Sequence, residues 1–406
     1  MIALSPRASG ARVKRLTRPL YVYAALEDFV LLYPVYALLF ADNGLSVPEI
    51  SSLFVIGAAS GMLLEIPSGA WADAVSRRVL LSIGPLLSAA GFALWFLVPA
   101  YLSFALGFVL WNAGASLRSG SMEALVYEEL DHLGEAERYV TVMGRVRAIG
   151  LVAVAAATAV ATPVLAVGGY FALGLASVLT CVLCALAGTA LPEHRAAAVQ
   201  DDEETGRYVA VLRAGLNEVR HNRPVRGALL LVAVVTAVWG GLEEYVPLLA
   251  AATGVSEATV PLLVLIVWGG VAIGGLLAGA ANRMPTRAFA VVLAVASLVM
   301  AAGALTGSPA GLVAVGAGFC VFQLASVIAD ARLQRRITGP SRATVTSLAG
   351  IGMDAGTVVV YGVYAALSPF ATHGMIFALF AAPYLCVAAA LLYGSAPPPP
   401  ASTDSR

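Results

Sequence analysis

The sequence predicts an all-α polytopic membrane protein with about twelve transmembrane helices arranged in two six-helix halves. Of its 406 residues, 60% are hydrophobic and only 12% are charged, and the mean hydropathy is +0.86. In soluble domains, roughly a quarter of the residues are charged. The apolar runs approach the roughly 20 residues that a bilayer helix needs, and they lack the alternation of barrel strands. Basic residues recur in every second loop.

The apolar segments follow one another with mostly short polar loops between them. Their approximate bounds are 19–41, 50–72, 79–100, 101–124, 140–166, 170–191, 227–252, 258–281, 288–306, 309–330, 343–367 and 373–394. The predicted organisation is a basic N-terminus (1–18), an N-terminal six-helix half (19–191), a linker (192–226), a C-terminal six-helix half (227–394) and a Pro-rich tail expected to be disordered (395–406).

The positive charges predict the orientation. Five of them precede the first segment: Arg7, Arg12, Lys14, Arg15 and Arg18. Further Arg residues lie in every second loop, whereas the alternate loops, such as 41–49 and 253–258, contain no Lys or Arg. Because cytoplasmic loops carry the excess of Lys and Arg, we expect a multi-pass protein of the inner (plasma) membrane with both termini and the linker in the cytoplasm.

The two halves resemble each other at an offset of about 210 residues. Gly44-Leu45-Ser46 after the first segment corresponds to Gly254-Val255-Ser256 after the seventh. Gly69 corresponds to Gly279 in the same register, and Arg77 to Arg287. A repeat of this kind is typical of transporters built from two related bundles.

The loop between the second and third segments carries a motif: Gly69, then Asp73, then Arg77 and Arg78. It resembles the loop 2–3 signature of the major facilitator superfamily. The resemblance implies that the Gly permits close helix approach, that the Asp lies near a helix end in the other half, and that the Arg residues join a charge network as a conformational gate. Glu123, low on the fourth helix, is the expected partner of Arg77. An ordinary positive-inside turn is the simpler alternative.

The resemblance covers nearly the whole chain, from about Arg18 to Tyr393, and implies the fold of that superfamily, with a parallel repeat of two six-helix halves. Residues 111–120 loosely resemble the helix 4 motif of drug exporters. The Gly-rich antiporter motif of helix 5, ending in Gly-Pro-x-x-Gly-Gly, is absent. An exporter-like subtype is therefore one expectation among several.

Ionisable residues deep in membrane helices are candidates for function because they are costly to place there. Asp28 is the first candidate for proton coupling, followed by Glu27 and Asp354. An apolar environment disfavours the charged form of a carboxyl group, which favours proton capture and release. A carboxylate held permanently by Arg145 or Arg147 is the competing interpretation.

Other polar and aromatic residues on these helices are candidates for lining a substrate cavity. They are Tyr36, Trp111, Arg118, Trp239, Glu243 and Tyr361. Glu243 lies close enough to a helix end that solvation there is an equal interpretation.

These features predict a secondary active transporter, coupled to protons, for efflux of a small, partly apolar organic compound such as a drug or natural product. A proton-symport importer, a transporter-like sensor and, last, an intramembrane enzyme are the alternatives. No Walker loop, metal-ligand spacing or nucleophile arrangement occurs, so we expect no enzyme activity and no cofactor or metal. The expected partners are the bilayer, a small substrate and protons, and we expect no nucleic-acid partner. We expect the protein to be a monomer.

Overall fold

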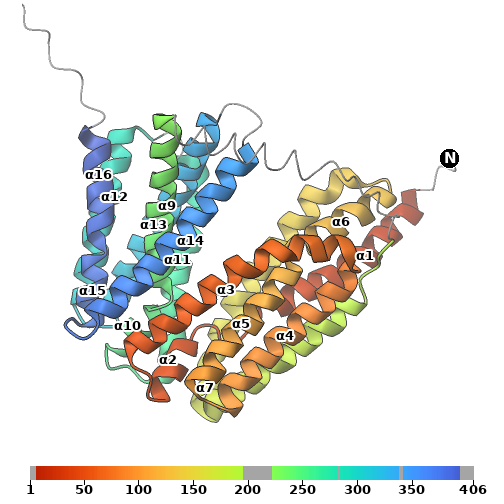
Figure 1. Cartoon of the computed structure of the whole chain (residues 1–406), viewed down its shortest axis with the longest axis horizontal. Coiled ribbons are helices and arrows are strands. Elements are labelled where there is room, and N and C mark those ends of the chain that lie inside the picture. Colours follow the sequence, from red (N-terminus) through yellow and green to blue (C-terminus); the bar gives the residue numbers. More distant parts are fainter. Residues whose placement is uncertain (1–5, 195–221, 282–283, 338–341, 394–406) are drawn as a thin grey trace, which may run out of the picture. The chain divides into compact units, whose positions relative to one another are not determined.

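A computed structural model of the chain describes residues 6–194, 222–281, 284–337 and 342–393, and the side chains of these except 6–11, 66–74, 223 and 342–344. The described residues are helical, with short turns between the helices (Figure 1). Most of the predicted linker and all of the predicted tail lie outside the described residues.

The helices follow in chain order. They are α1 (Pro6–Asp28), α2 (Tyr36–Asp42), α3 (Val47–Ala74), α4 (Arg77–Leu97), α5 (Tyr101–Arg118), α6 (Ser121–His132), α7 (Tyr139–Thr189), α9 (Arg223–Glu243), α10 (Val246–Ala251), α11 (Val260–Ala281), α12 (Thr286–Leu305), α13 (Gly311–Arg336), α14 (Arg342–Leu367), α15 (His373–Leu379) and α16 (Ala381–Tyr393), with short 3₁₀ turns at Ala136–Arg138 and Glu257–Thr259.

Nine helical segments in the described chain are long and apolar enough to cross a membrane. One of them contains α7, which runs through two predicted segments and turns between them at Gly169, a glycine with φ of 60°. Counting α7 twice and adding α5 and the pair α1–α2 accounts for twelve spans. The predicted fold class is confirmed.

The first helix of each half is discontinuous. α1 ends at Asp28, and Pro34 lies in the turn before α2. A break inside a membrane needs partners for the freed backbone groups, and the buried Ser177 Oγ of α7 accepts a hydrogen bond from the Leu32 N–H at 3.1 Å. The second half has the same break, between the end of α9 at Glu243 and the start of α10 at Val246. α10 begins 210 positions after α2, which begins at Tyr36.

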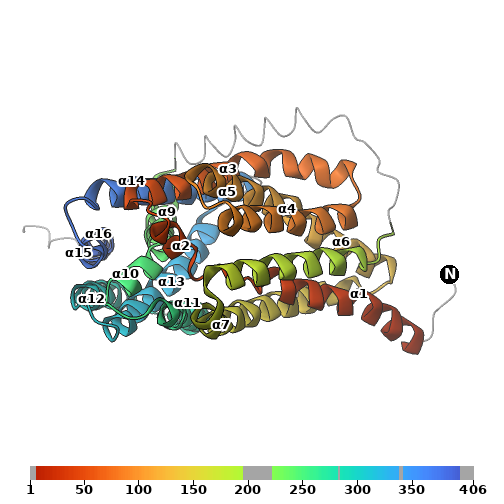
Figure 2. The ribbon, with the colours of Figure 1, turned by 90° about the horizontal axis from the view of Figure 1, so that it is seen from below.

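Contacts divide the chain into two units. Of the described residues, unit 1 comprises 6–194, 254–265 and 361–369, and unit 2 comprises 222–253, 266–281, 284–337, 342–360 and 370–393. In unit 1, α1 lies beside α7 (Figure 2), and α5 packs against α3 and α4. In unit 2, α13 packs against α9 and α12, and α12 also contacts α15 and α16.

Glycines set the spacing of α4 and α5. A Cβ atom on Gly84 would lie 2.7 Å from the carbonyl oxygen of Gly114, and one on Gly91 would lie 2.7 Å from that of Gly107. The two helices therefore approach backbone to backbone, as small residues allow in membrane helix pairs. This approach places the last residue of α5, Arg118, alongside α4.

Candidate functional site

The α1 break of unit 1 carries an intramembrane ion pair. Glu27 lies in the last turn of α1, and its Oε1 is 2.6 Å from Nε of Arg118 at the end of α5. The guanidinium also donates to Ser88 Oγ of α4 at 3.3 Å. The side chains of Arg118 and Glu27 are 14% and 23% exposed, so each charge depends on the other for compensation. The structure thus joins a predicted proton-coupling residue to a predicted cavity residue.

A small cavity opens beside this pair. Its volume is about 20 Å³, and roughly 10–15 Å³ is the least that holds one water. The lining residues are Glu27, Val30, Pro85, Ser88, Phe92, Trp111, Arg118, Cys181 and Cys184. Two predicted cavity residues, Trp111 and Arg118, therefore line one cavity. Its mixture of one ion pair with apolar walls suits a water or a small polar group held next to Glu27.

Asp28, the adjacent acid, lies against a different helix. Its Oδ2 occupies the place beside Gly150 of α7 where a Cβ atom would stand. The residue as a whole is exposed, so this contact is made by the tip of the carboxylate. Successive residues on a helix project about 100° apart, which explains why Glu27 and Asp28 meet different neighbours. Neither Arg145 nor Arg147 forms an ion pair with Asp28 in the described part of the chain.

The predicted cavity residue Tyr36 lies in the aromatic core of unit 1. It is 4% exposed, and its ring centroid lies 5.7 Å from that of Trp95 and 5.8 Å from that of Phe108. Trp111 joins this cluster to the cavity, with its ring 6.2 Å from Tyr36. Tyr36 is thus one ring removed from the cavity wall.

The remaining candidates are not gathered into that cavity. In unit 2, Trp239 of α9 donates from Nε1 to Ser326 Oγ at 3.0 Å, Glu243 ends α9 at its break, and Asp354 is exposed on α14. Tyr361 belongs by its contacts to unit 1 and is 6% exposed.

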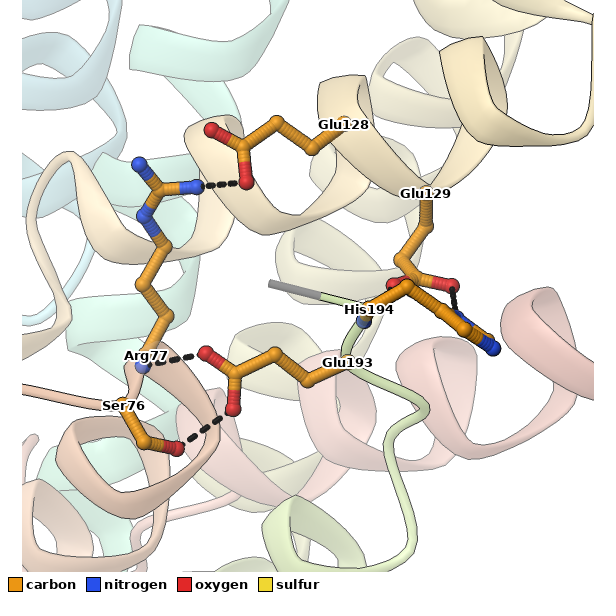
Figure 3. Close-up of polar contacts among 6 residues, drawn as sticks. All are labelled: Ser76, Arg77, Glu128, Glu129, Glu193 and His194. Atoms are coloured by element: carbon orange, nitrogen blue, oxygen red, sulfur yellow. Dashed lines mark hydrogen bonds and ion pairs between the residues drawn. The ribbon is translucent and has the colours of Figure 1, made fainter. Parts of the chain in front are cut away.

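A second polar cluster lies at the predicted cytoplasmic end of unit 1 (Figure 3). Arg77, the first residue of α4, forms an ion pair with Glu128 of α6. The backbone N–H of Arg77 donates to Glu193 Oε1 at 2.8 Å, and Ser76, the N-cap of α4, donates its hydroxyl to the same carboxylate. Glu193 thus satisfies a free N–H at a helix N-terminus, where a negative charge is favoured.

The neighbouring residue, His194, docks onto α6. Its backbone N–H donates to Glu129 Oε1 at 2.5 Å, and its Nδ1 lies 3.0 Å from Glu129 Oε2 (Figure 3). Glu129 is only 3% exposed. The ring of His132 stacks on that of His194 with centroids 4.5 Å apart. Residues 193 and 194 thereby connect the end of the sixth predicted span to α4 and α6.

The prediction that Glu123 is the partner of Arg77 is wrong. The structure pairs Arg77 with Glu128, whereas Glu123 lies in the first turn of α6. The reason is that the predicted fourth segment is two helices: α5 ends at Arg118, Gly120 with φ of 72° turns the chain, and α6 begins a new direction. Arg78 is exposed.

Two residues of the predicted gate motif, Gly69 and Asp73, lie in the backbone of α3, and their side chains are outside the described ones.

The sequence profile described as the Major Facilitator Superfamily matches residues 21–359. The chain belongs to the major facilitator superfamily. It is accordingly a membrane transporter of the secondary class rather than an enzyme. A search of curated proteins finds no match.

Solved structures of this superfamily show the same fold. A mutant form of the nucleoside transporter NupG superposes with a TM-score of 0.77 at 14% identity, covering 94% of this chain and 100% of that one. A bacterial homologue of the human lysosomal transporter Spinster gives 0.69 at 17%, covering 96% and 97%. A D-xylose-proton symporter gives 0.62 at 13%, covering 95% and 97%. At such identities the likeness concerns the fold alone.

Several residues of the site carry no clear signal in the sequence. Ser88 and Gly150 had no signal because small residues occur throughout these helices. Glu193 and His194 directly follow Pro192 at the end of an apolar segment, and their position gives no sign of their contacts with Arg77 and Glu129, which lie 116 and 65 positions earlier in the chain.

Proposed function

We propose that this superfamily member exports a small, partly apolar organic compound from the cell in exchange for protons. The observation that carries the proposal is the acidic pair at the break of α1. Glu27 is compensated by Arg118 beside a small cavity with mostly apolar walls, and Asp28 lies against α7 without an ion-pair partner in the described chain. Intramembrane carboxyl groups of this kind mark proton relays in transporters.

In this mechanism Asp28 is the coupling residue. Its carboxyl group takes a proton when it is open to one side of the membrane and releases it on the other, and bound substrate competes with the proton. Glu27 stands second because Arg118 holds its charge, and Asp354 stands third.

The test begins with a growth screen for compounds exported by the chain in a strain lacking its own exporters. Proton-gradient-driven transport of the compound found is then measured in proteoliposomes for Asp28→Asn, with Glu49→Gln at the exposed start of α3 as the control. We expect Asp28→Asn to lose gradient-driven transport and to keep substrate binding. Unchanged transport would remove Asp28 from the mechanism, and inward flux with protons would establish import instead.

We further propose that Gly69, Asp73, Arg77 and Arg78 form a conformational gate. Asp73→Asn should lower transport and leave expression largely intact, because the substitution removes a charge and keeps the shape. Transport at the parental rate would show the motif to be an ordinary loop.

The proposed location is the inner (plasma) membrane, with the protein acting as a monomer and both termini in the cytoplasm. Reporter fusions at Gln200 and after Tyr393 should both read as cytoplasmic. A periplasmic signal from either would contradict this topology.

A further inference from the structure

One glycine of α7 stands out by what occupies the space of its missing side chain. A Cβ atom on Gly150 would overlap Asp28 Oδ2 and lie 3.4 Å from Asp28 Cγ. Apart from Gly150 itself, its two chain neighbours and the nearby backbone of α7, no other atom of the described chain is found within 4 Å of that position. Gly150 itself is buried. We call the space left by the missing side chain of Gly150 the notch in α7. It is filled by the Asp28 carboxylate.

The charged groups around Asp28 come from two elements. Glu27 precedes it on α1, and Arg118 reaches across from α5. From α7, the helix that packs along α1, the Arg145 and Arg147 side chains are exposed and form no ion pair with Asp28 in the described chain. The contact of Asp28 with α7 is thus one of shape, made at Gly150.

We propose that Gly150 is a positioning residue for the coupling carboxylate: the notch on α7 seats the tip of Asp28 and so determines where this group meets its proton. The inference rests on the proposed function in taking Asp28 as the coupling residue. Its consequence is that movement of α7 along α1 changes how far the carboxylate is covered.

Gly150→Ala tests the seat directly. An added methyl group cannot share the space with Oδ2, so the carboxylate must move by about 1 Å to reach ordinary contact. The displaced atoms are the far end of a short, rotatable side chain, so the fold is retained. Gly144→Ala is the matched control, because a Cβ atom on Gly144 of the same helix meets nothing within 4 Å. Both substitutions raise helix propensity equally.

The readout is pH-difference infrared spectroscopy of the purified full chain, which needs no substrate. The carboxyl band of protonated Asp28 is assigned by its loss in Asp28→Asn. We expect Gly150→Ala to shift the midpoint of that band's titration by about 0.5 pH unit or more, and Gly144→Ala to leave it in place. The proton uptake of Asp28→Asn and of Asp28→Asn/Gly150→Ala should be equal.

An unchanged midpoint in Gly150→Ala would overturn the inference, as would an equal shift in Gly144→Ala or a shift in proton uptake that persists in the double variant. These outcomes are separate from those of the proposed function. If gradient-driven transport survives Asp28→Asn, the coupling role of Asp28 is wrong, even where Gly150→Ala shifts the titration of the band. If Gly150→Ala does not shift the titration, the positioning role of Gly150 is wrong, even where Asp28 is required for transport.

Discussion

Arg118 at the end of α5 and Glu27 at the end of α1 form an ion pair with a distance of 2.6 Å between Nε and Oε1. The two residues are 91 positions apart in the chain. The close approach of α4 and α5 at Gly84 and Gly114 holds Arg118 against α4, and from there its guanidinium reaches Glu27 on α1. A partly buried pair of this kind is held by mutual compensation, and losing one partner leaves a charge in surroundings that cannot solvate it.

Arg118→Met should therefore lower the stability of the protein by about 3–5 kcal/mol, since Glu27 then remains without its partner. Glu27→Met/Arg118→Met should recover most of that loss, because the double variant buries neither charge. Thermal unfolding in detergent measures both. Equal stability of the single and double variants would show that the pair contributes by packing only.

Trp95 and Trp111 should respond differently to the same substitution. Trp95 is fully buried and its Nε1 donates to the Phe104 carbonyl at 3.1 Å, so Trp95→Phe should cost about 1–3 kcal/mol, because it removes this hydrogen bond and leaves a cavity beside the smaller ring. Trp111 is half-buried and is one of the residues predicted to contact the substrate, so Trp111→Phe should change the KM for transport and leave the melting temperature nearly unchanged. An unchanged KM would remove Trp111 from the predicted substrate contacts.

Adjacent acids on α6 provide a third test. Glu129 is buried and holds the His194 backbone and ring, whereas the Glu128 side chain is 50% exposed and pairs with Arg77. Glu129→Ala should cost about 1.5–3 kcal/mol, the usual contribution of hydrogen bonds to a charged group. Glu128→Ala should cost about 0.2–1 kcal/mol, as for exposed ion pairs. Chemical denaturation of the two variants compares them, and equal costs would contradict the docking of His194.

Glu193 should protect the first turn of α4. Its carboxylate accepts from the Arg77 N–H and the Ser76 hydroxyl, so Glu193→Gln should speed amide hydrogen exchange over residues 77–80 by roughly five- to tenfold, equivalent to about 1–1.4 kcal/mol at a helix N-terminus. Glu123→Gln, the acid first expected to pair with Arg77, should leave that exchange unchanged. Faster exchange in Glu123→Gln alone would restore the original pairing.

The internal repeat and the gate loop show how much could be predicted. The correspondence of Gly44 with Gly254 indicated an offset of about 210, and the structure begins α2 and α10 at that offset, with φ of 85° and 80° at the two glycines. These two glycines could be predicted from the sequence because only glycine adopts this conformation readily. The partner of Arg77 could not be predicted, because Glu123 and Glu128 are chemically equivalent.

By itself the sequence determined the class of the protein, the number of spans and the residues that are costly in a membrane, because these depend on composition, length and the sign of charges along the chain. Only the tertiary structure decided which groups meet: Glu27 with Arg118, Asp28 with Gly150, and Arg77 with Glu128. Each contact depends on where a helix ends and how closely it packs on its neighbour. The sequence gives no sign of the contact between Asp28 and Gly150, because a glycine has no side chain and the contact forms only when α1 packs against α7.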